Sequence, residues 1–188
     1  MIDKAHRNKL AVLFVTGVVV LGLALPACTG GEPAATEELP APAELSFEAA
    51  EYANADHGFS VKYPSDWAES PADGPFIVFG AQAAKQVPAL VVAVAEGATF
   101  ADALTATLEE AGGSKIEIAP ERETTLPDGT PASEATAKTK IQGLGADAFA
   151  LGVTKDGKWV IVAILTVGML AKYDEPLFSE VAHTLQFD

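Results

Sequence analysis

The stretch HGFSVKYPSDW, from His57 to Trp67, decides how the fold begins. Apolar and polar side chains alternate in its first half, with Phe59, Val61 and Tyr63 on one side. This period of two is typical of a strand with one buried face. The preceding NADHG favours a turn, so we expect two strands, one on each side of it.

The second half of the same stretch is predicted to turn the chain. Tyr63 and Pro64 are expected to fix the exit of the chain from the strand, and Pro64 disfavours helical backbone at Tyr63. We interpret Ser65–Glu69 as a short helical turn with Ser65 as its cap, and we expect Trp67 to bury its indole beneath it. The aromatic and proline positions thus have a structural explanation.

The rest of the folded part predicts an antiparallel sheet. PFIVFG and ALVVAVA are short apolar runs, typical of strands covered on both faces. The turn-forming LPDGT, QGLG and KDG separate further strand candidates, which favours successive hairpins. These candidates are 114–125, 131–141, 146–154 and 158–167. The last of them, KWVIVAILTV, is the most apolar and is expected near the sheet centre.

Two amphipathic segments are predicted to be helices. The first runs from Thr99 to Ala111, with Thr99 as N-cap and two glycines after its end. The second runs from Asp174 to Leu185, with Asp174 as N-cap and Pro176 in its first turn. Since the strands are covered on both faces, the fold class predicted is α+β, an antiparallel β-sheet sandwiched between helices (α/β/α).

Residues 1–27 have the organisation of a signal peptide. MIDKAHRNK carries three basic residues and precedes an uncharged apolar run, LAVLFVTGVVVLGLAL. The run ends in LPAC, which resembles the lipobox of bacterial lipoproteins except at Pro26, where a small or branched residue is usual. This resemblance implies cleavage between Ala27 and Cys28 and diacylation of the Cys28 sulfur.

An uncleaved transmembrane anchor is the alternative interpretation of this segment. A membrane span needs about 20 mainly apolar residues, and Leu10–Ala27 approaches that length. With either anchor, the remainder of the chain is expected to lie outside the cytoplasm. Two or three acyl chains would hold the protein on a bacterial membrane, because one chain alone binds only marginally.

Residues 28–45 are predicted to be a disordered tether, and residues 46–188 a folded domain. The tether sequence TGGEPAATEELPAPAEL is rich in Pro, Ala and Glu and has almost nothing to bury. Cys28 is the only cysteine, so no disulfide is available to the folded part.

The charge of the mature chain is strongly acidic. The whole sequence has 12 basic and 26 acidic residues, and the signal peptide removes three and one of them, which leaves 9 and 25 and a net charge of −16. Such a surface repels nucleic acid and anionic lipid headgroups, so no nucleic-acid partner is expected. An ordinary solvated surface explains the acidity. A divalent-cation site is a more specific alternative, but no DxDxDG-like loop supports it.

Three stretches together resemble the PsbP-like domains of the PsbP/LpqN/DcrB-like superfamily, which includes bacterial lipoproteins. They are GFSVKYPSDW, ATFADALTATL, and DGKWVIVAILTV followed by FSEVAHTLQF. The signature residues have matching spacing, and they are Gly58, Phe59, Tyr63, Pro64 and Trp67. The resemblance covers roughly 46–188 and departs from the family at Thr184–Phe187, where a serine and an aromatic-containing strand are usual. It implies an α/β/α sandwich whose members bind other proteins or assist assembly of membrane complexes, with no shared catalytic motif.

Candidates for chemistry are few. The mature chain holds two histidines, His57 and His183, and we interpret both as surface or helix-edge residues. Ser60 is three residues from His57, but it belongs to the polar face of a strand and no GxSxG elbow is present. Asp66 and Glu69 are assigned to the helical turn, and the glycines of GLG to a hairpin. We therefore expect no enzyme activity, cofactor or metal site.

The function expected from the sequence is that of a lipid-anchored, non-enzymatic envelope protein. Its PsbP-like domain would bind a protein partner or support assembly of a membrane complex. One alternative is a small-ligand or lipid carrier with an apolar cavity between sheet and helix. A hydrolase is the third, and it would need a deep cleft that holds His57 or His183 beside a serine or a carboxylate.

Overall fold

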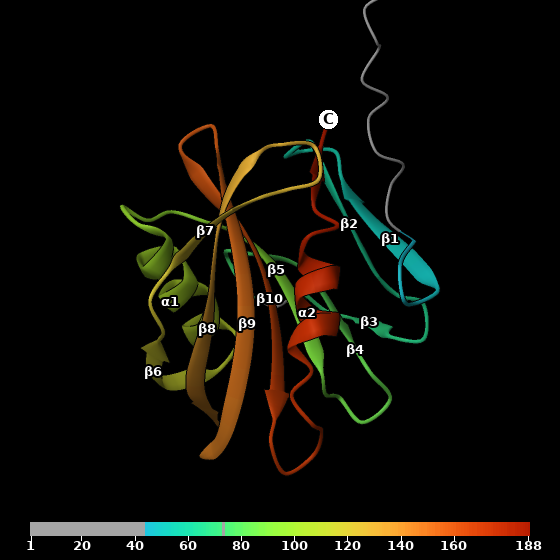
Figure 1. The fold of residues 1–188 in the computed structure, drawn as a ribbon. Helices are drawn as coiled ribbons and strands as arrows, with labels where there is room; N and C mark the ends of the chain where they lie inside the picture. The colour runs from blue at the N-terminus through green and yellow to red at the C-terminus, as the bar shows by residue number, and fades with distance from the viewer. Residues whose placement is uncertain (1–43, 73) are drawn as a thin grey trace, which may run out of the picture. The chain divides into compact units, whose positions relative to one another are not determined.

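The computed structural model of the chain describes residues 44–72 and 74–188. The predicted signal peptide, Cys28 and most of the predicted tether lie outside these residues. In the described part, two antiparallel sheets and two helices make up the fold (Figure 1). No helix in that part is long and apolar enough to cross a membrane.

The smaller sheet has the strand order β1-β2-β11, and the larger has the order β3-β4-β5-β10-β9-β8-β6, with β7 also paired to β8. The strands are β1 Ala49–Asn54, β2 Phe59–Pro64, β3 Ala68–Ser70, β4 Ile77–Gln82, β5 Ala89–Ala95, β6 Gly113–Ile118, β7 Arg122–Thr125, β8 Pro131–Ile141, β9 Leu144–Lys155, β10 Lys158–Val167 and β11 Gln186–Phe187. The helices are α1 Phe100–Glu110 and α2 Glu175–Ala182.

The hairpin predicted from the opening stretch is confirmed, but it does not join the main sheet. β1 and β2 pair around the predicted turn, with Asn54 opposite Phe59. The other edge of β2 pairs with β11, where Phe187 lies opposite Phe59. The expectation of one sheet is therefore wrong, because the strand after Gly58 takes its second partner from the far end of the domain.

The helical turn predicted at Ser65–Glu69 is also wrong. The amide of Trp67 donates to the carbonyl of Pro64 at 3.0 Å, which closes a tight turn. The chain then enters β3, where Ala68 pairs with Gln82 of β4. Ladder hydrogen bonds with β4 thus replace those of a helix. Trp67 is buried, as predicted.

The strand predicted at the centre of the sheet lies there. β10 has the predicted limits, pairs with β5 on one side and β9 on the other, and is buried almost throughout. Its alternate side chains enter two different cores, with Val160, Val162 and Ile164 in one and Ile161, Ala163 and Leu165 in the other. Both faces of the larger sheet are therefore covered.

The helix α1 covers one of these faces. Thr99 caps it as predicted, and Thr99 and Asp102 exchange hydrogen bonds in a capping box. Phe100, Leu104 and Leu108 are buried against the sheet. The strands present mainly alanine to this helix, and these small side chains let it pack closely: Ala93, Ala95, Ala135, Ala137, Ala148, Ala150 and Ala163.

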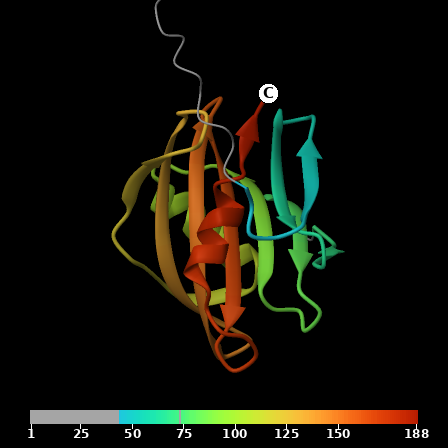
Figure 2. The ribbon, with the colours of Figure 1, turned by 45° about the vertical axis from the view of Figure 1, so that its right-hand side comes forward.

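The opposite face is shared by α2 and the smaller sheet, which lie beside each other (Figure 2). Asp174 caps α2 as predicted, and Phe178 and Val181 are buried. The helix ends at Ala182, earlier than the predicted Leu185, because the chain there extends towards β11. The predicted sandwich is thus matched only in part: both faces carry a helix, but the fold is richer in sheet.

The predicted strand 114–125 is two strands, β6 and β7, on the same edge of β8. Between them, the amide of Ala119 still donates to the carbonyl of Thr136 at 2.9 Å. Pro120 has no amide hydrogen and so cannot continue the ladder. The chain therefore bends at this point, and β7 runs separately along the first half of β8.

Tyr173, which lies just before α2, should make the free energy of unfolding depend on pH. Its hydroxyl is buried, and no partner for it exists in the described residues. Burial, with smaller contributions from the carboxylates of Glu175 and Asp147, raises the pKa of Tyr173 to about 12. Since the unfolded chain ionises first, the free energy of unfolding should fall as pH rises from about 10 towards 12, and be unaffected by this group below that window.

The variant Tyr173→Phe should lose this contribution to the pH dependence. It should also raise the free energy of unfolding by about 1 kcal/mol near neutral pH, because an unpaired buried hydroxyl is costly. Urea unfolding of both chains on each side of about pH 10 would measure both effects. If the two chains lose the same stability above that pH, the assignment is wrong.

Candidate functional site

The signature aromatic residues form the junction between the two sheets. Phe59, Tyr63 and Trp67 are buried. The ring of Tyr63 lies 5.2 Å from that of Phe79 in β4, and Tyr52 of β1 stacks on the same Phe79 ring at 4.2 Å. These contacts join the smaller sheet to β4, so the aromatic residues of the motif serve packing.

The other signature positions are explained by the backbone. Gly58 has φ of 58°, in the left-handed region, and a Cβ there would lie 3.2 Å from Lys155 Nζ. This ammonium group donates to the carbonyl of Gly58 at 2.9 Å. Pro64 is buried where β2 ends.

At the same corner, burial and then the neighbouring carboxylate of Glu69 raise the pKa of Tyr63, whose hydroxyl donates to Glu69 Oε1 at 3.3 Å.

The structure does not join His57 and Ser60 into a reactive pair. His57 lies in the turn before β2, where its amide donates to Asn54 Oδ1 at 3.1 Å and its ring lies 6.5 Å from that of Phe59. Ser60 lies in β2 between Ala53 and Gln186 of the neighbouring strands. No hydrogen bond links the two side chains in the described part of the chain.

A polar network that the sequence did not predict joins α2 to β7 and β8. Arg122 Nη2 lies 3.1 Å from Glu134 Oε1 and 3.5 Å from Glu175 Oε1. The other oxygen of Glu134 lies 3.7 Å from His183 Nε2. His183 is therefore a helix-edge residue, as expected, and it belongs to a cluster of residues brought together from three elements.

The network brings His183 beside both a serine and a carboxylate, which are the components of a hydrolase triad. However, its Nδ1 lies 2.8 Å from the backbone carbonyl of Ser179 and 3.3 Å from Ser179 Oγ. Because a carbonyl only accepts, Nδ1 carries the hydrogen and has no lone pair to take a proton from the hydroxyl. This trio is thus suited to fixing α2 on the sheet.

A hollow of about 740 Å³ lies beyond the N-terminal end of α1, on the sheet face that this helix covers only in part. Trp159 and Gly152 of the central strands line it, and the ring of Trp159 lies 5.7 Å from that of Phe100 at the start of α1. A Cβ at position 152 would lie 2.6 Å from Phe100 Cδ2, so the glycine admits that ring. The remaining lining residues are mostly hydroxyl-bearing: Glu123, Thr124, Thr125, Thr130, Pro131, Ala132, Ser133 and Thr154.

The position of this hollow differs from that of the predicted cavity between sheet and helix. Strands β7–β10 and the turn after β7 supply its lining, and neither helix contributes a residue. The side chains of Thr125 and Thr154 are exposed, so the hollow is open to solvent. Hydroxyl groups and one indole can hydrogen-bond and stack against a polar ligand or a peptide segment.

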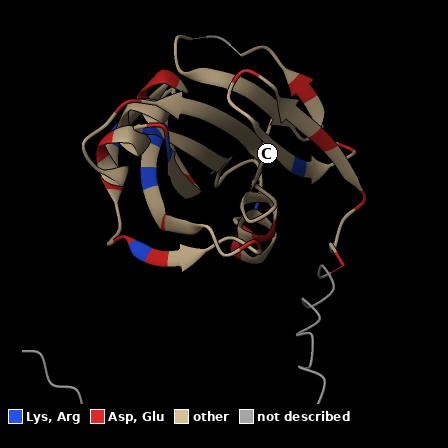
Figure 3. Cartoon of the chain, turned by 90° about the horizontal axis from the view of Figure 1, so that it is seen from above, with Lys and Arg blue, Asp and Glu red and all other residues tan. Residues whose placement is uncertain are grey.

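A metal centre finds no support in the part of the chain that the structure describes. No group of three or more His, Cys, Asp or Glu side chains is placed there to hold an ion. Acidic positions are instead spread around the domain, as Figure 3 shows in a view from above. The acidity therefore has the distribution of a solvated surface.

Known protein structures share the architecture of the described residues. No protein-family model matches the chain, and no curated protein matches its sequence. Among solved structures, it is similar to the cyanobacterial PsbP (CyanoP) from Synechocystis sp. PCC 6803, with a TM-score of 0.56 and 16% identity over 79% of this chain and 96% of that one. The described domain has a PsbP-like fold.

The Ran-binding protein Mog1p from Saccharomyces cerevisiae has a similar structure. Its TM-score is 0.51 at 11% identity, over 76% of this chain and 96% of that one. At such identities the likeness shows the fold alone. The fold expected from the sequence resemblance is therefore confirmed at this level, and the lipoprotein character stays a prediction.

Proposed function

We propose that this chain is a lipid-anchored, non-enzymatic envelope protein, attached outside the cytoplasm through Cys28, whose PsbP-like domain binds a protein partner. Such binding would support assembly of a membrane complex. The observation that carries the binding role is the open hollow beside β7, which would receive a segment of the partner. The anchor is inferred from the basic start, the apolar run and the LPAC ending of the sequence.

The shape and lining of the hollow favour a peptide segment over a carried lipid. A lipid carrier encloses apolar chains, whereas this hollow is open and is lined by threonine and serine hydroxyls around Trp159. Its outer wall is β7, which pairs with β8 alone and therefore has one edge without a strand partner in the described sheet. An extended segment can bind such an edge through main-chain hydrogen bonds.

One structural neighbour is a protein-binding protein by name. Mog1p is named a Ran-binding protein, so a similar architecture binds a protein in yeast. Nothing about Ran itself transfers to the present chain at 11% identity. The neighbour supports only the general proposal that this fold can serve as a binding module.

Site-specific photo-crosslinking in intact cells tests this proposal. A benzophenone amino acid would replace Thr154 or Thr125, two exposed residues that line the hollow from different strands. We expect both positions to give an adduct with the same protein. Glu51, exposed in β1, is the control position and should not give that adduct.

The variant Trp159→Ala should weaken both adducts, because it removes the indole from the hollow. Its folding would be checked by circular dichroism, since the indole also contacts Phe100. If Thr154 and Thr125 give no adduct beyond that from Glu51, the hollow does not bind a partner. A small molecule that copurifies with the parent chain but not with Trp159→Ala would favour the carrier alternative.

A further inference from the structure

One end of the domain is built from four connections that the sheet brings together. They are 82–88 between β4 and β5, 111–115 between α1 and β6, 138–146 around the β8–β9 turn, and 166–173 between β10 and α2. The pairings Ala89 with Leu165, Ala146 with Val167 and Gly113 with Ile141 place these connections side by side. We call the surface formed by these four segments the basic end.

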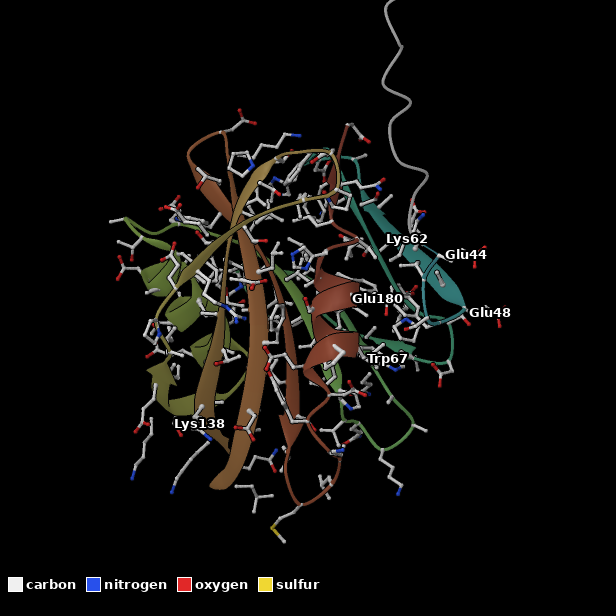
Figure 4. The ribbon with its side chains drawn as sticks, viewed as in Figure 1. Glu44, Glu48, Lys62, Trp67, Lys138 and Glu180 are labelled. Atoms are coloured by element: carbon white, nitrogen blue, oxygen red, sulfur yellow. The ribbon has the colours of Figure 1, made fainter. Side chains whose placement is uncertain are left out.

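The basic end reverses the charge of the rest of the protein. It contains five exposed lysines and no Asp or Glu, in a chain whose formal net charge is −14. Lys138 projects from it in Figure 4. The five are Lys85, Lys115, Lys138, Lys140 and Lys172. Carboxylates border it along the chain at Glu109, Glu110 and Asp174. Along the paired strands the nearest are Asp147, which lies 3.2 Å from Lys138 Nζ, and Glu117 opposite Lys138 in β6.

The same surface carries the exposed large apolar side chains of the described residues. Met169 is 82% exposed, Leu170 is 53% exposed and Leu144 is 42% exposed. The amide of Gly168 donates to the carbonyl of Gly145 at 3.4 Å, which holds the two loops that carry these residues next to each other. Apolar side chains gathered at one place and surrounded by lysines are typical of a surface that meets a membrane interface.

We propose that the basic end docks on the surface of an anionic phospholipid bilayer. Met169, Leu170 and Leu144 enter the headgroup region, and the surrounding lysines contact lipid phosphates. The inference rests on the proposed function in one respect, because the anchor at Cys28 brings the domain to the bilayer. It adds a defined orientation, in which the β8–β9 turn and the loop before α2 face the membrane.

The net negative charge of the chain does not oppose this contact. Salt screens charges beyond about 8 Å at physiological ionic strength, whereas the eleven residues of β8 alone extend about 35 Å away from the basic end. The bilayer therefore interacts mainly with the lysines closest to it. Repulsion of the acidic remainder disfavours the reverse orientation, so both effects select the same pose.

The length of the chain between anchor and domain permits the pose. The sixteen residues 28–43 can reach at most about 55 Å when fully extended, which exceeds the length of β8. An anchor at Cys28 is thus compatible with any face of the domain on the membrane. The side chains on the surface of the domain then determine which face contacts the bilayer. The lysines and apolar side chains of the basic end favour contact through that end.

A depth-dependent quenching experiment tests the orientation. The full chain carrying Met169→Cys would be purified from membranes, labelled with an environment-sensitive fluorophore and reconstituted into vesicles that contain doxyl-labelled lipid. The matched control is Asp128→Cys in the exposed turn between β7 and β8, at the opposite end of β8. In vesicles with phosphatidylglycerol, lipid quenching at position 169 should exceed that at position 128 by at least about threefold.

The lysines are tested in the same assay. Replacing phosphatidylglycerol by phosphatidylcholine should reduce the quenching at position 169 towards that at position 128. Replacing Lys140 and Lys172 by glutamine should have the same effect. Equal quenching at the two positions in phosphatidylglycerol vesicles would overturn the proposal. The cysteine at position 169 could also be protected from thiol labelling in native membranes and yet not be quenched in vesicles. A protein would then cover the basic end, and this result would also overturn the proposal.

The mass of the N-terminal peptide distinguishes a failure of the docking proposal from a failure of the lipid-anchor proposal. An unmodified Cys28 in the membrane-purified chain would refute the lipid anchor, and it would also bind the fluorophore as a second thiol. An acylated chain without preferential quenching at position 169 would refute the docked orientation alone. The two failures are therefore distinguishable in a single preparation.

Discussion

Replacing Cys28 by serine is expected to leave the chain uncut, unacylated and at its full length. A hydroxyl cannot form the thioether on which lipoprotein processing depends, so the effect should be complete. Loss of the acyl chains removes about 0.8 kcal/mol of membrane affinity for each buried methylene group. The measurement is the mass of the N-terminal peptide, together with metabolic labelling by a fatty-acid analogue.

Thr29→Ala is the matched control for this change, since it alters the next residue and keeps the cysteine. It should be cut and acylated like the parent chain. A Cys28→Ser chain that is still processed and labelled would contradict the lipobox assignment. A parent chain that keeps residues 1–27 and carries no lipid would instead favour the uncleaved anchor.

Phe178→Ala is expected to lower the free energy of unfolding by about 3–5 kcal/mol, the usual range for a buried phenylalanine. The side chain of Phe178 is fully buried and its ring lies 5.3 Å from that of Tyr173 in an edge-on contact. Truncation leaves a cavity between α2 and the larger sheet, because the rigid strands can close it only in part. Urea unfolding followed by circular dichroism gives the difference.

The control for this variant is Met169→Ala, which also removes a large apolar side chain. Met169 is 82% exposed, so its loss should change the free energy of unfolding by less than about 0.5 kcal/mol. A loss below about 1.5 kcal/mol for Phe178→Ala would mean that the helix and the sheet repack around the gap. The contact of α2 with the sheet would then be looser than the burial of Phe178 indicates.

Local sequence patterns predicted the elements whose signals lie within them. β8 and β10 have the predicted limits, and α1 has the predicted cap, because hairpin turns, apolar runs and a capping box are local features. The prediction for the segment after Pro64 is wrong for the opposite reason. A serine and two acidic residues suit a helix start as well as a tight turn, and the pairing of β3 with β4 decided between them.

The division into two sheets and the polar network could not be predicted in this way. Both depend on residues that are distant in sequence: β2 pairs with β11, and His183 of the last helix meets Glu134 of β8. The hollow beside β7 likewise needs Thr125 of β7, Thr154 of β9 and Trp159 of β10 to be placed together. His183 is recognisable in the sequence as a candidate, but its carboxylate partner Glu134 carries no local signature.

The pairing of Phe59 with Phe187 has a consequence for how the protein is made. The ribosome releases the chain from its N-terminal side, so Phe59 emerges long before its strand partner. Until residue 187 is free, one edge of β2 keeps unpaired amides and carbonyls, and such an edge can recruit other chains. A nascent or truncated chain is therefore more open to association through this edge, and pairing with β11 closes the edge at Phe59 and Ser60.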